Sequence, residues 1–175
     1  MDLNEIYCFR KENTYLQNKK EFREAIMLYE DKMKMHPDAT IGPRESEKHH
    51  PLEHTFCDGL YIRKITSPPG SLISSGIHKK EHSWFLMQGR MSILSEEGIK
   101  EIKAPASGIT KPGTKRLIYT HNECIFTTVH ATDCKDVDSV EKEICAADFN
   151  DKDIVSYDKK EAMLLKIDNT KKIIT

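Results

Sequence analysis

Hydrophobic positions follow a helical period in the N-terminal part of the chain. Between residues 19 and 35, apolar side chains recur every three or four positions: Phe22, Ile26, Tyr29 and Met33. This spacing predicts one amphipathic helix over residues 19–35, whose apolar stripe has to pack against another element. Residues 38–54 contain two prolines, a glycine and many charges without any period, which is typical of a connector. We expect the histidines of this connector to be solvated: His49, His50 and His54.

From residue 55 onward, short apolar runs are separated by glycine and proline turns, the spacing expected of a β-sandwich or barrel. The sequence predicts eight strands, enough for a jelly roll: 60–66, 71–77, 82–88, 90–95, 99–103, 106–110, 116–120 and 123–131. Residues 132–160 are acidic and without a period, and residues 162–167 have the pattern of a last strand. The chain is therefore predicted to be mainly β, with three parts: a helix and connector (1–50), a barrel (51–147) and a C-terminal tail (148–175).

Composition and charge exclude several classes of protein. The chain has 175 residues, 38% of them apolar, which is enough for one domain with a buried core. Charged residues make up 31% and nearly cancel to a net charge of -1, whereas a nucleic-acid-binding domain carries a basic field. The N-terminus lacks the basic start and apolar core of a signal peptide, and no apolar run approaches the roughly 18 residues of a membrane span. We therefore expect a cytoplasmic protein with no nucleic-acid or membrane partner.

The five cysteines are scattered along the chain: Cys8, Cys57, Cys124, Cys134 and Cys145. They form neither a CxxC pair nor a regular framework, so they are predicted to be reduced thiols. The sequence has no glycine-rich phosphate loop, no GxSxG elbow and no recognisable cysteine–histidine nucleophile motif. Covalent catalysis therefore has no support.

Two histidines four residues apart, His78 and His82, precede an apolar run that ends at Gly89. On one extended strand, both side chains would point to the same face and could share a metal ion. Neutral imidazole suits zinc, iron, copper or nickel, but two ligands need a third protein group to complete a site. The alternative is a polar strand end, because the residues between the histidines are all charged: Lys79, Lys80 and Glu81.

The third ligand is sought on the last strong strand. Its alternating positions form one mixed set and one set without charge or imidazole: Cys124, Phe126, Thr128 and His130 against Ile125, Thr127 and Val129. We expect the second set to face a core and the mixed set to line a pocket or face solvent. His130 is then the preferred third metal ligand, ahead of His121, which lies at a turn. The alternative for His130 is a hydrogen-bonded structural histidine.

The segment from Gly76 to Gly89 resembles the first motif of the cupin family, in which two histidines, a glutamate and a closing glycine build a metal pocket in a small β-barrel. Counting back from Gly89, His82 stands at the glutamate position, His78 at the second histidine and Gly76 at the first. In the second motif, Lys111 stands at the proline and Arg116 at the metal-binding histidine. The resemblance covers roughly residues 56–131, and is shared with cupin proteins common in phage and prophage genomes. It implies a single double-stranded β-helix, the cupin jelly-roll barrel, and commonly a homodimer.

Arg116 suggests a different use of the same pocket. Guanidinium does not ligate metals, but an inward-pointing arginine would place a permanent forked cation there, suited to carboxylate or phosphate. Lys111 and Lys115 would enlarge this field if their side chains converge, as would Lys79 and Lys80. Trp84 completes the predicted ligand-binding set; one of Trp84 and Phe85 should fill the barrel and the other pack beneath the N-terminal helix or a partner subunit. The alternative is that the basic residues form only a solvated rim.

Three functional hypotheses follow. The first is a phage-type cupin protein that binds a small anionic metabolite or nucleotide with Arg116, beside a degenerate metal site. The second is an enzyme of oxygenase or isomerase type that uses His78 and His82 to hold a divalent metal, namely Zn, Fe, Mn or Ni. The third is a structural or assembly protein with an inert barrel. The sequence does not decide whether a reaction is catalysed.

Overall fold

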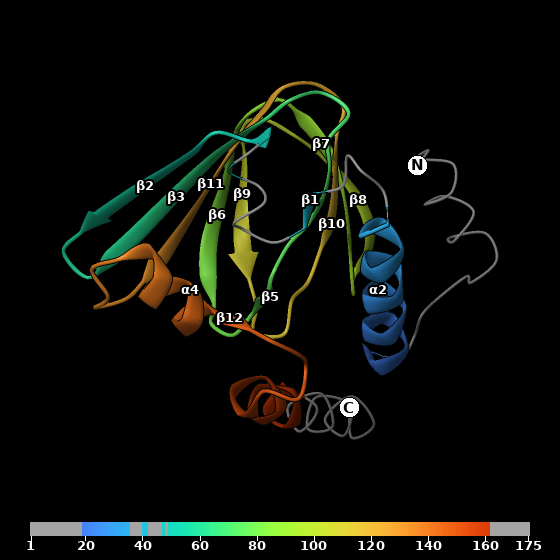
Figure 1. The fold of residues 1–175 in the computed structure, drawn as a ribbon, viewed down its shortest axis with the longest axis vertical. Helices are drawn as coiled ribbons and strands as arrows, with labels where there is room; N and C mark the ends of the chain where they lie inside the picture. The colour runs from blue at the N-terminus through green and yellow to red at the C-terminus, as the bar shows by residue number, and fades with distance from the viewer. Residues whose placement is uncertain (1–18, 36–39, 42–46, 48, 162–175) are drawn as a thin grey trace, which may run out of the picture.

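The computed structural model of the protein describes residues 19–35, 40–41, 47 and 49–161, and it consists mainly of β-strands (Figure 1). The first sheet has the order β1-β4-β10-β7-β8, with bounds Thr40–Ile41, Leu72–Ser74, Leu117–Thr120, Arg90–Ser95 and Gly98–Lys103. The second has the order β2-β3-β11-β6-β9, with bounds Leu52–Cys57, Leu60–Ser67, Cys124–Ala131, His82–Gln88 and Ala106–Thr110. A short third pair joins β5, Ile77–His78, to β12, Cys145–Ala146.

The two five-stranded sheets face each other as the halves of a jelly roll, closer together at one end than at the other (Figure 1). Successive strands cross between the sheets: β6 and β9 belong to the second, while β7 and β8 between them belong to the first. Side chains from both sheets meet in one core cluster of buried residues: Leu86, Met91, Ile93 and Cys124. The predicted jelly-roll fold is confirmed.

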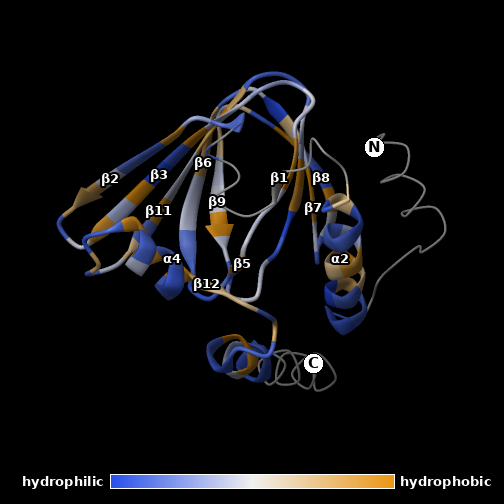
Figure 2. Cartoon of the chain, in the orientation of Figure 1, coloured by the Kyte–Doolittle hydropathy of each residue, from blue (hydrophilic) through white to orange (hydrophobic). Residues whose placement is uncertain are grey.

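Helix α2, Lys19–Met33, packs against the outer face of the first sheet. Its buried residues Phe22, Ile26 and Met33 form a cluster with Leu117 of β10, as the predicted apolar stripe requires. Figure 2 shows hydrophobic and hydrophilic residues alternating around this helix. None of the described helices has the length and hydrophobicity that a membrane crossing requires.

Most predicted strands are confirmed to within one residue at each end. The exception is the run 71–77, which the structure divides into β4 and β5. Cys57, Cys124, Cys134 and Cys145 are free thiols. The predicted last strand at 162–167, and Cys8, lie outside the described residues.

Two parts of the sequence prediction were wrong. The supposed connector ends in strand β2, where residues alternate between half-buried and exposed along its length, and His50 before it is buried instead of solvated. The supposedly irregular stretch 132–160 contains helix α4, Val137–Ile144, and a second helical run at 152–161. Helix α4 starts at Asp136, whose side chain accepts a hydrogen bond from the Ser139 backbone N–H. It was missed because its charges hide a short apolar stripe that packs on Tyr61: Val140 and Ile144.

One face of β11 differs from the prediction. Its mixed set points inward as expected, with Cys124, Thr128 and His130 buried, whereas the set expected in a core is only half-buried: Ile125, Thr127 and Val129. On β6, Trp84 stacks on Phe126 with 5.7 Å between ring centroids. Phe85 is 39% exposed and does not pack beneath the helix, because α2 covers the other sheet.

Candidate functional site

A cavity of about 80 Å³ lies between the two sheets. Strands of both sheets line it, together with the residues before β5 and β10. None of its seventeen lining residues is acidic: Leu52, Arg63, Ile65, Ser67, Ile73, Ser74, Ser75, Gly76, His78, His82, Met91, Arg116, Ile118, Thr120, Phe126, Thr128 and Cys145. The cavity is therefore apolar over much of its wall and positive where it is charged.

Both charged groups of the wall are arginines. Arg63 lies on β3, and Arg116 lies directly before β10. Arg116 Nη1 donates a hydrogen bond to Thr110 Oγ1 at 2.9 Å, and burial lowers the pKa of the Arg116 guanidinium, which nevertheless stays charged at neutral pH. Within the described residues, neither arginine has a carboxylate close enough for an ion pair. Glu97 acts on Arg116 from a longer distance and raises its pKa, but the described part of the chain holds no carboxylate in contact with either guanidinium.

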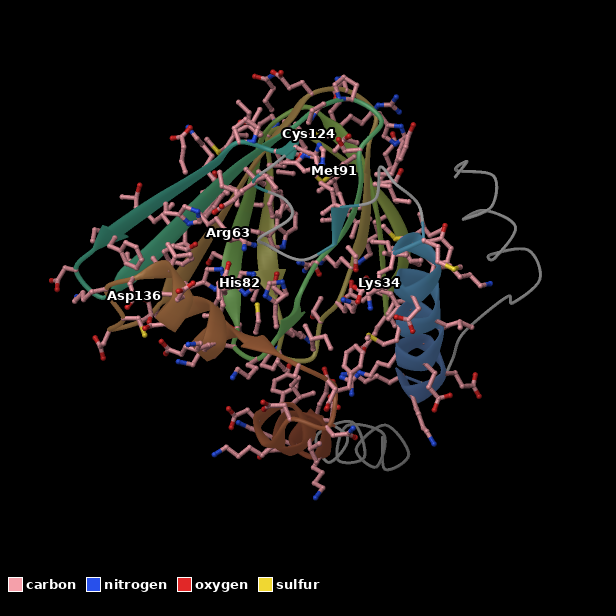
Figure 3. The ribbon with its side chains drawn as sticks, in the orientation of Figure 1. Lys34, Arg63, His82, Met91, Cys124 and Asp136 are labelled. Atoms are coloured by element: carbon pink, nitrogen blue, oxygen red, sulfur yellow. The ribbon has the colours of Figure 1, made fainter. Side chains whose placement is uncertain are left out.

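Three histidine rings pack together beside the arginines. The His78 and His82 ring centroids are 4.5 Å apart, and His130 lies 4.1 Å from His82 and 6.4 Å from His78. All three side chains are at most 5% exposed. Figure 3 labels Arg63 and His82, which come from strands β3 and β6 of the second sheet. The structure therefore brings together the three predicted metal ligands.

Burial keeps these imidazoles neutral. Burial, followed by the charges of Arg116 and Arg63, lowers the pKa of His82 to about 4. Burial, followed by His82 and Arg63, lowers the pKa of His130 to about 3, and the same kind of environment holds the pKa of His78 well below its usual value. Several ring nitrogens have no hydrogen-bond partner among the described residues: Nδ1 of His78, Nε2 of His82, and both nitrogens of His130. These atoms remain able to accept a donor or to ligate a metal.

The two motif histidines are held by different strands, so neither of the single elements that would align them by spacing carries both. His78 ends β5 and His82 begins β6, with a three-residue turn between them. The β5–β12 pair sets Cys145 opposite His78, and the Lys79 backbone N–H donates to the carbonyl of Ile144 at 2.8 Å. Helix α4 and β12 thus form a strap that fixes the turn, and the turn fixes both rings.

The residues fit a metal ion only in part. Neutral imidazoles with unpartnered nitrogens are suitable donors. However, the described part of the chain has no group of three His, Cys, Asp or Glu side chains arranged to hold a metal ion. At the position of the first cupin histidine, Gly76 has no side chain, and Cys145 Sγ lies 3.0 Å from the place where a Cβ would be. A thiol from β12 therefore fills the space of that ligand.

The other predicted site residues lie outside the cavity. Lys115 is buried, but its Nζ lies 2.6 Å from Glu30 Oε2. Lys111 is exposed, with its Nζ 3.5 Å from Glu161 Oε1. Trp84 contributes only indirectly, by stacking on the lining residue Phe126. Ligand binding by these three residues stays a prediction, whereas Arg116 lies where it was expected.

Sequence reasoning did not single out most residues of the cavity wall, and three of them matter for its chemistry: Arg63, Thr128 and Cys145. Arg63 shares its strand with Lys64, and nothing in the sequence distinguishes an inward arginine from a solvated one. Thr128 was placed on the correct face but not singled out as a site residue. Cys145 comes from the strap, which was predicted to be irregular.

No protein-family model matches the sequence, and no curated protein matches it. Among solved structures, the cupin 2 domain-containing protein from Halorhodospira halophila has a TM-score of 0.44 at 14% identity, covering 55% of this chain and 77% of that one. The cupin domain of Cnp3 from Schizosaccharomyces pombe has a TM-score of 0.42 at 15% identity, covering 53% and 68%. An acetylacetone dioxygenase from Acinetobacter johnsonii has a TM-score of 0.40 at 20% identity, covering 46% and 58%. The function of the chain has to come from its own residues.

Proposed function

We propose that this cupin-fold chain binds a small anion between Arg63 and Arg116. The observation that supports this function is a cavity with two guanidinium groups in its wall and no acidic residue. A buried charge without a partner is costly, and pairing it with an opposite charge offsets part of that cost. Guanidinium also offers a planar fork of donors that matches carboxylate and phosphate oxygens.

The size of the cavity limits the ligand. At about 80 Å³ it is well below the roughly 300–1,000 Å³ typical of pockets for drug-sized molecules. Its volume favours a ligand of a few non-hydrogen atoms, such as a short carboxylate or phosphate, over a nucleotide. Apolar lining residues leave room for a short carbon chain beside the acidic group: Ile65, Ile73, Ile118 and Phe126.

Isothermal titration calorimetry with inorganic phosphate and with propionate tests this function. We expect saturable binding of at least one of them, weakened by roughly tenfold or more in Arg116→Gln and in Arg63→Gln, which removes about 1.4 kcal/mol or more of binding free energy. Arg90→Gln is the matched control, because Arg90 is exposed and pairs with Glu101 on the outside of the barrel. Absence of saturable binding, or equal binding by both cavity variants and the wild type, would contradict the proposal.

A second candidate function is supported by the histidine cluster. A divalent metal such as Zn, Fe, Mn or Ni would be held by His78, His82 and His130, whose unpartnered, neutral ring nitrogens are suitable donors but would have to turn toward one point to bind it. A metal bound there would act as a Lewis acid on a substrate oxygen, as in an enzyme of oxygenase or isomerase type. Arg116 would then orient an anionic substrate beside it.

Elemental analysis of protein purified without a histidine tag tests the metal site. Near-stoichiometric metal that disappears in the His78→Ala, His82→Ala double variant, and stays in the exposed control His49→Ala, would support it. Metal-free wild-type protein that takes up none of the four ions on dialysis would rule it out.

The third hypothesis, an inert barrel with a role in assembly, is favoured if the arginine and histidine variants change nothing except stability. Homodimerisation through exposed strands or terminal segments stays a prediction. Native mass spectrometry of the full chain measures the oligomeric state directly, and a monomer at every concentration would contradict that prediction.

A further inference from the structure

We infer that the anion bound in this cavity carries a hydroxyl group next to its acidic group, as in a short hydroxycarboxylate or a hydroxyalkyl phosphate. This inference rests on the proposed small-anion function and narrows its ligand. The two arginines would pair only with the acidic group of the ligand. The unpaired polar atoms of the wall indicate which other group the ligand carries.

Three polar atoms of the cavity wall have no hydrogen-bond partner among the described residues. They are His78 Nδ1, His82 Nε2 and Thr128 Oγ1. The three side chains are 4%, 5% and 5% exposed, and all of them line the cavity that Arg63 and Arg116 line. A buried polar atom left without a partner costs about 1–3 kcal/mol. A ligand that forms hydrogen bonds with these atoms removes this cost and therefore binds more tightly.

A hydroxyl group is the partner that suits all three atoms. It both donates and accepts, so it pairs with an imidazole nitrogen in either tautomer and with the threonine hydroxyl. An ammonium group would suit the nitrogens as a donor, but the two guanidinium charges in the same small cavity would repel it. A second carboxylate could not accept from a ring nitrogen that carries no proton.

The strand register places the hydroxyl close to the acidic group. Thr128 of β11 lies directly opposite Arg63 of β3 in the antiparallel pair. Directly opposed residues have Cβ atoms about 4.5–5.5 Å apart, so the guanidinium and the threonine hydroxyl reach neighbouring atoms of one ligand. A hydroxyl one or two carbons from the acidic group fits this separation. An anion without a hydroxyl can still accept a hydrogen bond from Thr128, but it offers no donor to a ring nitrogen that carries no proton.

Matched ligand pairs test the inference on metal-free protein. Lactate is compared with propionate, and hydroxyethyl phosphate with ethyl phosphate, by isothermal titration calorimetry. We expect the hydroxylated member of at least one pair to bind roughly tenfold or more tightly, and the pair that shows this identifies the acidic group. The difference in binding free energy between the two members of that pair should fall by at least half in Thr128→Val. This variant replaces the hydroxyl by a methyl group of similar size.

Thr127→Val is the matched control, because Thr127 is the neighbour of Thr128 on the opposite, half-buried face of the same strand. His82→Gln is the second variant, which keeps the test decisive if Thr128→Val fails to fold. Equal binding of both members in both pairs overturns the inference, and so does a preference that neither variant reduces. If the hydroxyl inference fails in either way but propionate or inorganic phosphate still binds and depends on Arg116, the small-anion function stands. If no anion binds at all, the small-anion function and the hydroxyl inference are both overturned.

Discussion

Lys115 Nζ lies 2.6 Å from Glu30 Oε2 and forms an ion pair whose side chains are only 4% and 9% exposed. It joins helix α2 to the segment that carries Arg116. Ser74 Oγ also donates to Glu30 Oε2, and Lys115 Nζ donates to the carbonyl of Ser75 at 2.8 Å. Burial alone would raise the pKa of Glu30, but the hydrogen bonds from Lys115 and Ser74 outweigh it and leave that pKa below its usual value. The helix is thus docked by a buried charge pair as well as by its apolar stripe.

Removing one partner of this pair should be far more damaging than removing both. Lys115→Met leaves the buried Glu30 carboxylate with only the half-exposed Lys34, whose Nζ lies 3.7 Å from Oε1, and we expect it to lower the free energy of unfolding by about 3 kcal/mol. The double variant Glu30→Met, Lys115→Met should recover most of that loss, apart from the cost of leaving the Ser74 hydroxyl unpaired. Urea denaturation measures both. A double variant less stable than Lys115→Met would contradict this account.

Gly89 and Gly98 form a natural comparison, because their φ angles are +94° and +92°. A Cβ at Gly89 would lie 2.3 Å from the carbonyl oxygen of Glu123 and 2.6 Å from Cys124 Sγ, whereas a Cβ at Gly98 meets nothing within 4 Å. Gly98→Ala should lower the free energy of unfolding by only the roughly 1–2 kcal/mol that backbone strain at a positive φ costs. Gly89→Ala should lower the free energy of unfolding by about 1–3 kcal/mol more, because the added methyl group overpacks against the core strand. Thermal unfolding of the two variants tests this, and equal losses would show that φ alone makes Gly89 necessary.

The metal-free protein should lose stability as the pH falls below the ordinary histidine pKa of 6.5. His82 and His130 have pKa values of about 4 and about 3 in the folded state, so between 6.5 and 4 the unfolded chain binds protons that the folded chain does not. Each such histidine lowers the free energy of unfolding by up to about 1.4 kcal/mol per pH unit.

Denaturation across that pH range measures the slope. His82→Gln and His130→Gln should each make it shallower, whereas the exposed control His49→Gln should leave it nearly unchanged. A wild-type stability that is constant between pH 6.5 and 4 would show that the buried histidines take up protons in the fold as readily as in the unfolded chain.

Glu143 ties the strap to the site. Its carboxylate accepts hydrogen bonds from Lys80, in the turn between the motif histidines, and from Thr132 and Cys134. These contacts lower the pKa of Glu143 to about 2, so its contribution is present above the ordinary carboxyl pKa of 4.5 and is lost as the pH falls toward 2. Glu143→Gln should lower the free energy of unfolding by about 1–3 kcal/mol.

Hydrogen exchange locates the effect of this change. The amides of β5 and β12 should exchange faster in Glu143→Gln, and those of helix α2 should not. Glu141→Gln, in the same helix, is the control and should leave both regions unchanged. Faster exchange throughout the protein would indicate a general loss of stability instead of a loosened strap.

Local patterns were sufficient where one face of an element is buried along its whole length. The stripe of Phe22, Ile26 and Met33 predicted helix α2, and the alternating runs from residue 82 to residue 110 predicted four strands correctly. Helix α4 is short and rich in charge, and strand β2 has no fully buried residue, so neither showed a clear period. On β11 the inward face was identified correctly, but the opposite face is only half-buried instead of packing in a core.

The sequence by itself determined the jelly-roll barrel, its N-terminal helix and the candidates His78, His82 and His130, because period and spacing are properties of neighbouring residues, and the resemblance to the cupin motifs added Arg116. Only the tertiary structure decided which other residues these candidates contact. It brought Arg63 and Thr128 from one strand pair, and Cys145 from the strap, into the cavity of Arg116, while it paired Lys115 with Glu30. Which charges remain unpaired depends on contacts between residues far apart in the chain, and we propose that those unpaired groups select the ligand.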